Sequence, residues 1–121
     1  MQGRFITLEG GDGCGKSTQA RLLADALEKN GITCRLTREP GGSPLGRGIR
    51  QTLLDPSFPD PPVPLAEILL FLADRAQHVA TVIRPALARG EWVLCDRHTD
   101  STLVYQGYAR GYALETLRRL N

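Results

Sequence analysis

RFITLEGGDGCGKST, at residues 4–18, joins a short apolar run to a glycine-rich segment that ends in a lysine and two hydroxyl residues. Within it, GGDGCGKS at residues 10–17 matches the G-x-x-x-x-G-K-[ST] phosphate-binding loop in full. The apolar run before the loop predicts a strand, and the amphipathic pattern after it predicts a helix. Because the motif requires this strand–helix setting, we expect the stretch to bind the phosphates of a nucleoside triphosphate.

The residue types in this loop suit phosphate chemistry. Glycines let the backbone approach an anion without a Cβ in the way, and the loop N–H groups form a concave anion site at a helix N-terminus. Lys16 is expected to neutralise the β- and γ-phosphates, and Ser17 to ligate Mg²⁺. A glycine-rich turn with a chance lysine is the plain alternative, which the strand–helix setting disfavours. The expected phosphate-binding residues are Gly10, Gly11, Asp12, Gly13, Cys14, Gly15, Lys16, Ser17 and Thr18.

The composition of the 121-residue chain is typical of one globular domain. Its formal net charge is only +2 and aromatic residues make up 6%, so we expect no nucleic-acid partner. No apolar stretch reaches membrane-spanning length, so no membrane partner is expected either. Cys14, Cys34 and Cys95 lack metal-ligand spacing and are odd in number, which favours the reducing cytoplasm.

Hydrophobic periodicity predicts that strands alternate with helices. The expected strands are residues 4–9, 32–37 and 92–95, the first and last of them buried. The expected helices are residues 16–29, 45–54, 66–89, 100–106 and 112–120. Pro85 should kink or split the helix that contains it, and residues 38–44 read as a loop. This alternation predicts an α/β fold with a parallel sheet, whose ligands bind at the carboxyl ends of the strands.

Polar residues cluster at those expected strand ends. Asp96 follows the last apolar run and can hold the water shell of Mg²⁺, while Arg97 can bind a phosphate with two hydrogen bonds from its planar guanidinium group. The alternative explanations are that Asp96 caps a helix or forms a salt bridge, and that Arg97 forms an ion pair at the surface. Arg38, Glu39 and Arg50 suggest a second anion site beside the phosphate loop. A second phosphate site indicates a phosphotransferase rather than a simple nucleotidase.

Two further groups suit the recognition of a base. The first shares one helical face at spacing i, i+4 and i+8, and consists of Glu67, Phe71 and Arg75. A ring and a guanidinium on one face can stack on a base and bind its edge, although a core role for Phe71 is the plain alternative. Ser101 and Tyr105 share a face in the same way, and Gln106 follows them. Hydroxyl and amide groups suit a base edge or a sugar.

With these residues in place, the chain resembles the bacterial thymidylate kinases, a family of P-loop nucleoside monophosphate kinases. The resemblance is carried by FITLEGGDGCGKST, TREPGGSPLGRGIR, EILLFLADRAQHV and DRHTDSTLVYQGYARG, the last three being specific in this order. It implies that residues 1–121 are the N-terminal portion of a single P-loop kinase domain with a three-layer fold. It further implies ATP and dTMP as substrates, Mg²⁺ as cofactor, a homodimer, and the reaction ATP + dTMP → ADP + dTDP in dTTP biosynthesis.

The resemblance also implies roles for individual residues. Phe71 would stack on thymine and Arg75 would contact its O4 edge, while Tyr105 would disfavour a 2′-hydroxyl. Arg50 and Arg97 would hold the dTMP phosphate. The implied catalytic residues are Asp12, Lys16, Glu39, Asp96 and Arg97. The implied dTMP-binding residues are Asp12, Glu39, Arg50, Phe71, Arg75, Arg97, Ser101, Tyr105 and Gln106. The implied metal ligands are Ser17, Glu39 and, through water, Asp96.

The phosphate loop departs from those members that carry a catalytic arginine in it, because its variable positions are Gly11, Asp12, Gly13 and Cys14. Other members supply this arginine from a mobile lid. We expect the lid and the C-terminal strands to lie beyond Asn121, and hence little kinase activity from 121 residues alone. A kinase for another nucleotide and an inactive nucleotide-binding fragment remain alternatives. A switch GTPase is disfavoured because the sequence lacks N-K-x-D.

Overall fold

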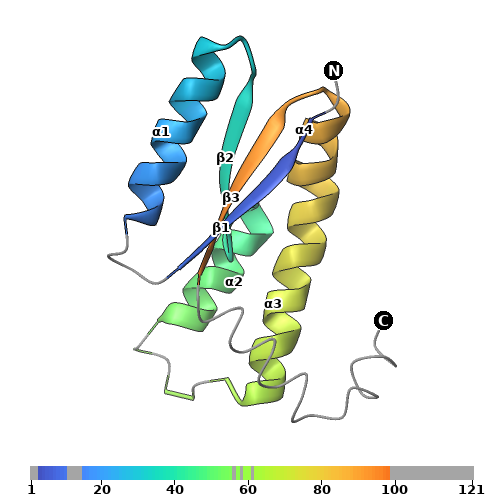
Figure 1. Cartoon of the computed structure of the whole chain (residues 1–121). Helices are drawn as coiled ribbons and strands as arrows, with labels where there is room; N and C mark the ends of the chain where they lie inside the picture. Colours follow the sequence, from blue (N-terminus) through green and yellow to red (C-terminus); the bar gives the residue numbers. More distant parts are fainter. Residues whose placement is uncertain (1–2, 11–14, 56, 58, 61, 99–121) are drawn as a thin grey trace.

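The computed structural model describes residues 3–10, 15–55, 57, 59–60 and 62–98 (Figure 1). Predictions for the helices at 100–106 and 112–120 lie outside these residues, as do those for part of the site. The site residues outside the description are Gly11, Asp12, Gly13, Cys14, Ser101, Tyr105 and Gln106. Within the described part, no helix combines the length and the apolar character needed to cross a membrane.

Among the described residues, the centre of the fold is a three-stranded parallel sheet in the order β1-β3-β2. Its strands are β1 (Phe5–Gly10), β2 (Cys34–Glu39) and β3 (Trp92–His98). The middle strand is β3, and the side chains of Val93, Leu94 and Cys95 are buried in it, which confirms the expected buried strand. The expected burial of β1 is only partial, because Phe5 is 37% exposed at the edge of the described sheet.

Two strands run further than the sequence predicts. β3 extends to His98, and β2 extends to Glu39, where a loop was expected. The reason is the parallel register, which pairs Arg38 with Asp96 and Glu39 with Arg97. Backbone pairing of this kind satisfies N–H and C=O groups and overrides the weak strand preference of charged residues. These four charged residues therefore sit on strands, with alternate side chains on opposite faces of the sheet.

Helices cover both faces of the sheet, with α1 on one side and α2 and α3 on the other (Figure 1). α1 (Lys16–Lys29) has the predicted bounds and starts after Gly15, whose φ of 79° is a left-handed conformation that favours glycine. α2 (Pro44–Leu54) is capped by Ser43, whose Oγ accepts a hydrogen bond from the Gly46 N–H at 2.9 Å. α3 (Pro64–His78) packs against α2 and β2. These layers confirm the predicted α/β architecture.

The predicted disruption at Pro85 takes the form of a π-helical turn. α3 passes into this turn at Val79–Ile83 and then into α4 (Arg84–Ala88). Proline lacks an N–H and its ring crowds the carbonyl four residues before it, so a wider turn relieves the helix. Ile83 at the end of the turn and Ala86 in α4 pack with Val93 in the hydrophobic core.

We expect Ile83→Ala to lower the free energy of unfolding by about 2–5 kcal/mol, because it leaves a cavity at a side chain that is 4% exposed. Leu22→Ala is the matched control on the 64% exposed Leu22 of α1, where the change should stay within about 0.5 kcal/mol. Urea unfolding of both variants measures the difference. Equal losses would contradict the placement of the core.

Candidate functional site

The site is organised around the carboxylate of Glu39, whose side chain is 3% exposed at the end of β2. Its Oε1 accepts a hydrogen bond from Arg75 Nε at 3.1 Å and pairs with Arg97 Nε at 3.3 Å. Its Oε2 lies 2.7 Å from Nδ1 of His78. Because α3 carries Arg75 and His78 while β3 carries Arg97, three elements meet at one carboxylate.

Glu39 is held in its ionised form. Burial by itself would raise the pKa of Glu39, but the hydrogen bond from His78 and the charges of Arg75 and Arg97 together bring the pKa below its ordinary value. An ionised carboxylate only accepts hydrogen bonds, so Nδ1 of His78 must be the donor to Oε2. This assignment fixes the proton on the ring nitrogen that faces Glu39.

The buried His78 is a residue that the sequence analysis missed as an individual site residue. Its second ring nitrogen, Nε2, lies 2.6 Å from the hydroxyl of Thr37. Thr37 and Glu39 are two residues apart on β2 and so lie on the same face, which lets one imidazole contact both. A signal was present in the sequence, because Asp74 and His78 are spaced i, i+4 and therefore share one face of the helix.

The loop after β2 is held against the same face of α3. Asp74 Oδ1 accepts a hydrogen bond from the Gly41 N–H at 2.9 Å, and Arg50 donates to the Pro40 carbonyl at 2.9 Å. A Cβ on Gly42 would lie 2.5 Å from His78 Nε2, so only glycine fits this approach without a shift of the loop or the ring. Burial raises the pKa of Asp74 above its ordinary value.

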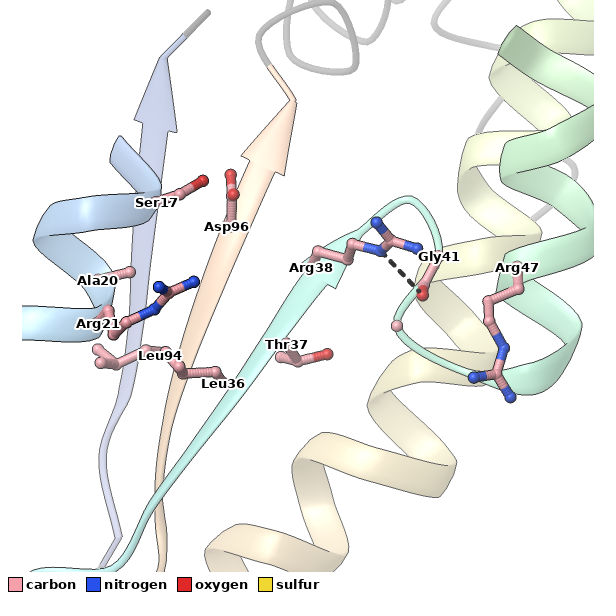
Figure 2. Close-up of a pocket in the computed structure, with 11 residues that line it drawn as sticks. Ser17, Ala20, Arg21, Leu36, Thr37, Arg38, Gly41, Arg47, Leu94 and Asp96 are labelled. Atoms are coloured by element: carbon pink, nitrogen blue, oxygen red, sulfur yellow. Dashed lines mark hydrogen bonds between the residues drawn. The ribbon is translucent and has the colours of Figure 1, made fainter. Parts of the chain in front are cut away.

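A hollow of about 470 Å³ lies on the α1 side of the sheet (Figure 2). Ser17 and Asp96, two of the predicted metal ligands, line it together, and Arg38 faces it from the end of β2. The arginines Arg21 and Arg47, which the sequence analysis did not single out, also line the hollow. Hydroxyl and carboxylate oxygens are the hard ligands that Mg²⁺ prefers, so this donor set fits the predicted ion.

The other predicted site residues that the structure describes lie on α1, α2, α3 and at the end of β1. Arg50 reaches from α2 to the loop after Glu39, and Phe71 is half-buried on α3, one turn before Arg75. Thr18 is exposed in the first turn of α1, and Gly10 ends β1. Of the predicted site residues, Glu39, Arg75 and Arg97 are in direct contact, through the Glu39 Oε1 contacts described above.

A second group of possible metal ligands, Glu39, His78 and Cys95, is better explained as a closed hydrogen-bonded cluster. Their ligand atoms lie within 4.8 Å of one another and all three residues are buried. However, burial and the nearby Glu39 charge raise the pKa of Cys95 to about 12, so the thiol stays protonated. Both ring nitrogens of His78 and both oxygens of Glu39 are already engaged by protein groups. Glu39 is therefore better suited to hold arginines than to bind metal.

Comparison with known proteins gives a consistent result. The thymidylate kinase family model matches residues 8–121. The chain is 60% identical to a thymidylate kinase of Synechococcus sp. (strain JA-3-3Ab), over 97% of this chain and 56% of the relative. It is 55% identical to a thymidylate kinase of Carboxydothermus hydrogenoformans, over 98% of this chain and 57% of the relative. The chain thus spans little more than half the length of these curated relatives.

A solved structure agrees with the sequence comparison. The thymidylate kinase from Ehrlichia chaffeensis matches with a TM-score of 0.75 at 40% identity, over 99% of this chain and 67% of that one. A parallel sheet with a phosphate-binding loop between β1 and α1 defines the P-loop class of nucleotide-binding proteins. Within that class, the chain belongs to the thymidylate kinase family.

Two glycines of α2 provide a matched test of the contact between α2 and α3. A Cβ on Gly46 would overlap Asp74 Oδ1 and lie 2.9 Å from Ser43 Oγ, whereas a Cβ on Gly48 would meet no atom within 4 Å. We expect Gly46→Ala to lower the free energy of unfolding by about 1–3 kcal/mol. Gly48→Ala should raise it by about 0.5–1 kcal/mol through helix propensity. Chemical denaturation measures both, and a stabilising Gly46→Ala would contradict the packing.

The lowered pKa of Glu39 predicts how stability depends on pH. Because the pKa is lower in the folded protein than in the unfolded chain, ionised Glu39 adds stability above the ordinary carboxyl pKa, and this contribution is lost as pH falls through the folded-state value. The difference in unfolding free energy between wild type and Glu39→Gln should therefore shrink from about pH 5 to about pH 2. Urea titrations across this range measure it, and a constant difference would refute the assignment.

Proposed function

We propose that this chain forms the phosphate-donor loop and the acceptor-binding part of a dTMP kinase, which catalyses ATP + dTMP → ADP + dTDP in dTTP biosynthesis. The observation that carries the proposal is the Glu39 cluster. It holds Arg75 and Arg97, two residues expected to bind the acceptor, on one buried carboxylate. Membership of the thymidylate kinase family supports the same reaction.

The donor side of the reaction is assigned to the phosphate loop and the hollow beside α1. The loop N–H groups and Lys16 would cradle the ATP phosphates, and Ser17 with Asp96 would hold Mg²⁺ directly and through water. When bound, Mg²⁺ supplies charge neutralisation on the β- and γ-phosphates. The chain's own contribution is to hold these phosphates in line with the acceptor.

The acceptor side is assigned to the opposite face of β2 and β3. Arg97 and Arg50 would hold the dTMP phosphate, and both are restrained in advance, Arg97 by Glu39 and Arg50 by the Pro40 carbonyl. Guanidinium groups fixed before the substrate arrives need no reorganisation when charge develops in the transition state. Phe71 would stack on thymine and Arg75 would bind its O4 edge. Asp12, Ser101, Tyr105 and Gln106 keep their predicted roles at the sugar, phosphate and base.

Two further features of the proposal concern assembly and location. We assign a homodimer that uses α3, and the exposed apolar side chains of Val63 and Leu69 at this helix support the assignment. We assign the reaction to the cytoplasm, where the described thiols of Cys34 and Cys95 would remain unpaired, as they are in the structure.

The test is an assay of dTMP-dependent ADP release with the protein at its natural length. Arg50→Ala should raise the KM for dTMP by about tenfold or more, because a charged hydrogen bond to phosphate is lost, while the KM for ATP stays within about threefold. Arg35→Ala is the matched control, since Arg35 is an exposed arginine near the start of β2, away from the carboxyl ends of the strands. It should leave both KM values unchanged.

The acceptor and the mode of action are decided by the same assay. Turnover of dUMP or UMP equal to that of dTMP would replace the proposal by a kinase for another nucleotide. Protection by nucleotide without turnover would replace it by a nucleotide-binding role. Absence of any dTMP-dependent ADP release, or equal effects of Arg50→Ala and Arg35→Ala, would overturn the acceptor assignment.

A further inference from the structure

We propose that His78 is a positioning residue for acceptor binding, which orients Glu39 and, through it, Arg75 and Arg97. The proposal rests on the proposed function, because it takes these two arginines as contacts to the acceptor. His78 itself is fully buried and lies behind Glu39, so it acts through the carboxylate and not by touching the substrate.

The imidazole of His78 is fixed at both nitrogens. Nδ1 donates to Glu39 Oε2 at 2.7 Å, and Nε2 lies 2.6 Å from Thr37 Oγ1. Both partners stand on the same face of β2, so the planar ring spans the strand and has one orientation that satisfies both contacts. The loop closes against the ring at Gly42, where a Cβ would lie 2.5 Å from Nε2.

The position of Oε2 determines the position of the other oxygen. A carboxylate is a rigid planar group, so a hydrogen bond that fixes Oε2 also fixes Oε1, which faces Arg75 at 3.1 Å and Arg97 at 3.3 Å. Arg75 is assigned to the base edge and Arg97 to the phosphate. One oxygen atom therefore helps to position both guanidinium groups. Through them it influences the distance between the group that contacts the base and the group that contacts the phosphate.

A purely structural role for His78 is the competing explanation, and the two ring nitrogens separate it from the proposal. Only the Nδ1 contact leads to Glu39 and its two arginines, whereas the Nε2 contact leads to Thr37. A structural role depends on the burial and on both hydrogen bonds. A positioning role depends on the Nδ1 contact alone.

The experiment compares His78→Asn with His78→Gln in the protein at its natural length. The Asn amide can reach the place of Nδ1 and keep the donor to Glu39, while the Gln amide can reach the place of Nε2 and keep only the Thr37 contact. We expect His78→Gln to raise the KM for dTMP by about tenfold or more, as for a lost charged hydrogen bond, and His78→Asn to raise it by less than about threefold. The KM for ATP should stay unchanged in both.

The outcomes separate this proposal from the proposed function. Suppose that the wild type turns over dTMP but the two variants have the same KM for dTMP, or that His78→Asn has the higher KM. Either result would overturn the positioning role and leave the proposed function standing. The same holds if KM merely follows the loss of thermal stability in both variants. A wild type without dTMP turnover overturns the proposed function and this proposal with it. Should His78→Gln not fold, Thr37→Val retains the Nδ1 contact, and a tenfold rise in its KM for dTMP would overturn the proposal.

Discussion

A buried ionised carboxylate must be compensated, and the compensation of Glu39 links most of the described fold. An unpaired charge in the interior costs several kcal/mol, so its partners are constrained to reach it. Arg75 and His78 reach it from α3 and Arg97 from β3, which fixes the helix against the sheet. The loop that follows Glu39 is held by Asp74, the residue just before Arg75 on α3, which accepts a hydrogen bond from the Gly41 N–H.

The alternation of side chains along a strand divides the site into two halves. Asp96 faces the hollow that Ser17 also lines, whereas its neighbour Arg97 pairs with Glu39 on the α3 side. The same holds for Arg38 and Glu39 on β2, which pair in register with Asp96 and Arg97. Of the predicted metal ligands, Ser17 and Asp96 thus lie on one face of the sheet, whereas Glu39 lies on the other face with the predicted acceptor contacts Arg75 and Arg97.

The local parts of this arrangement could be predicted from the sequence, and the parts that depend on distant contacts could not. The bounds of α1 and the burial of β3 follow from a motif and an apolar run, which are properties of neighbouring residues. The extension of β2 to Glu39 depends on pairing with β3, more than fifty residues away. The helical face that Arg75 shares with Phe71 predicted a contact with a base. Its ion pair with Glu39 could not be predicted from the neighbouring residues, because Glu39 is distant in the sequence. His78 was missed because its contacts with Glu39 and Thr37 join α3 to a distant strand, although its i, i+4 spacing with Asp74 places both residues on one face of the helix.

The π-helical turn at Val79–Ile83 has a consequence for the helical phase of the segment. In an α-helix each residue advances the direction of its side chain by about 100°. The wider turn resets this count between His78, which faces Glu39, and Ile83 and Ala86, which face the core. A π-helical turn forms i→i+5 hydrogen bonds and so holds one residue more than an α-helical turn. Loss of one residue from this turn would let it close as an α-helical turn and keep the apolar side of α4 directed at Val93. The segment between His78 and Pro85 should therefore tolerate the loss of one residue, whereas the same loss within α3 would turn every later side chain by about 100°.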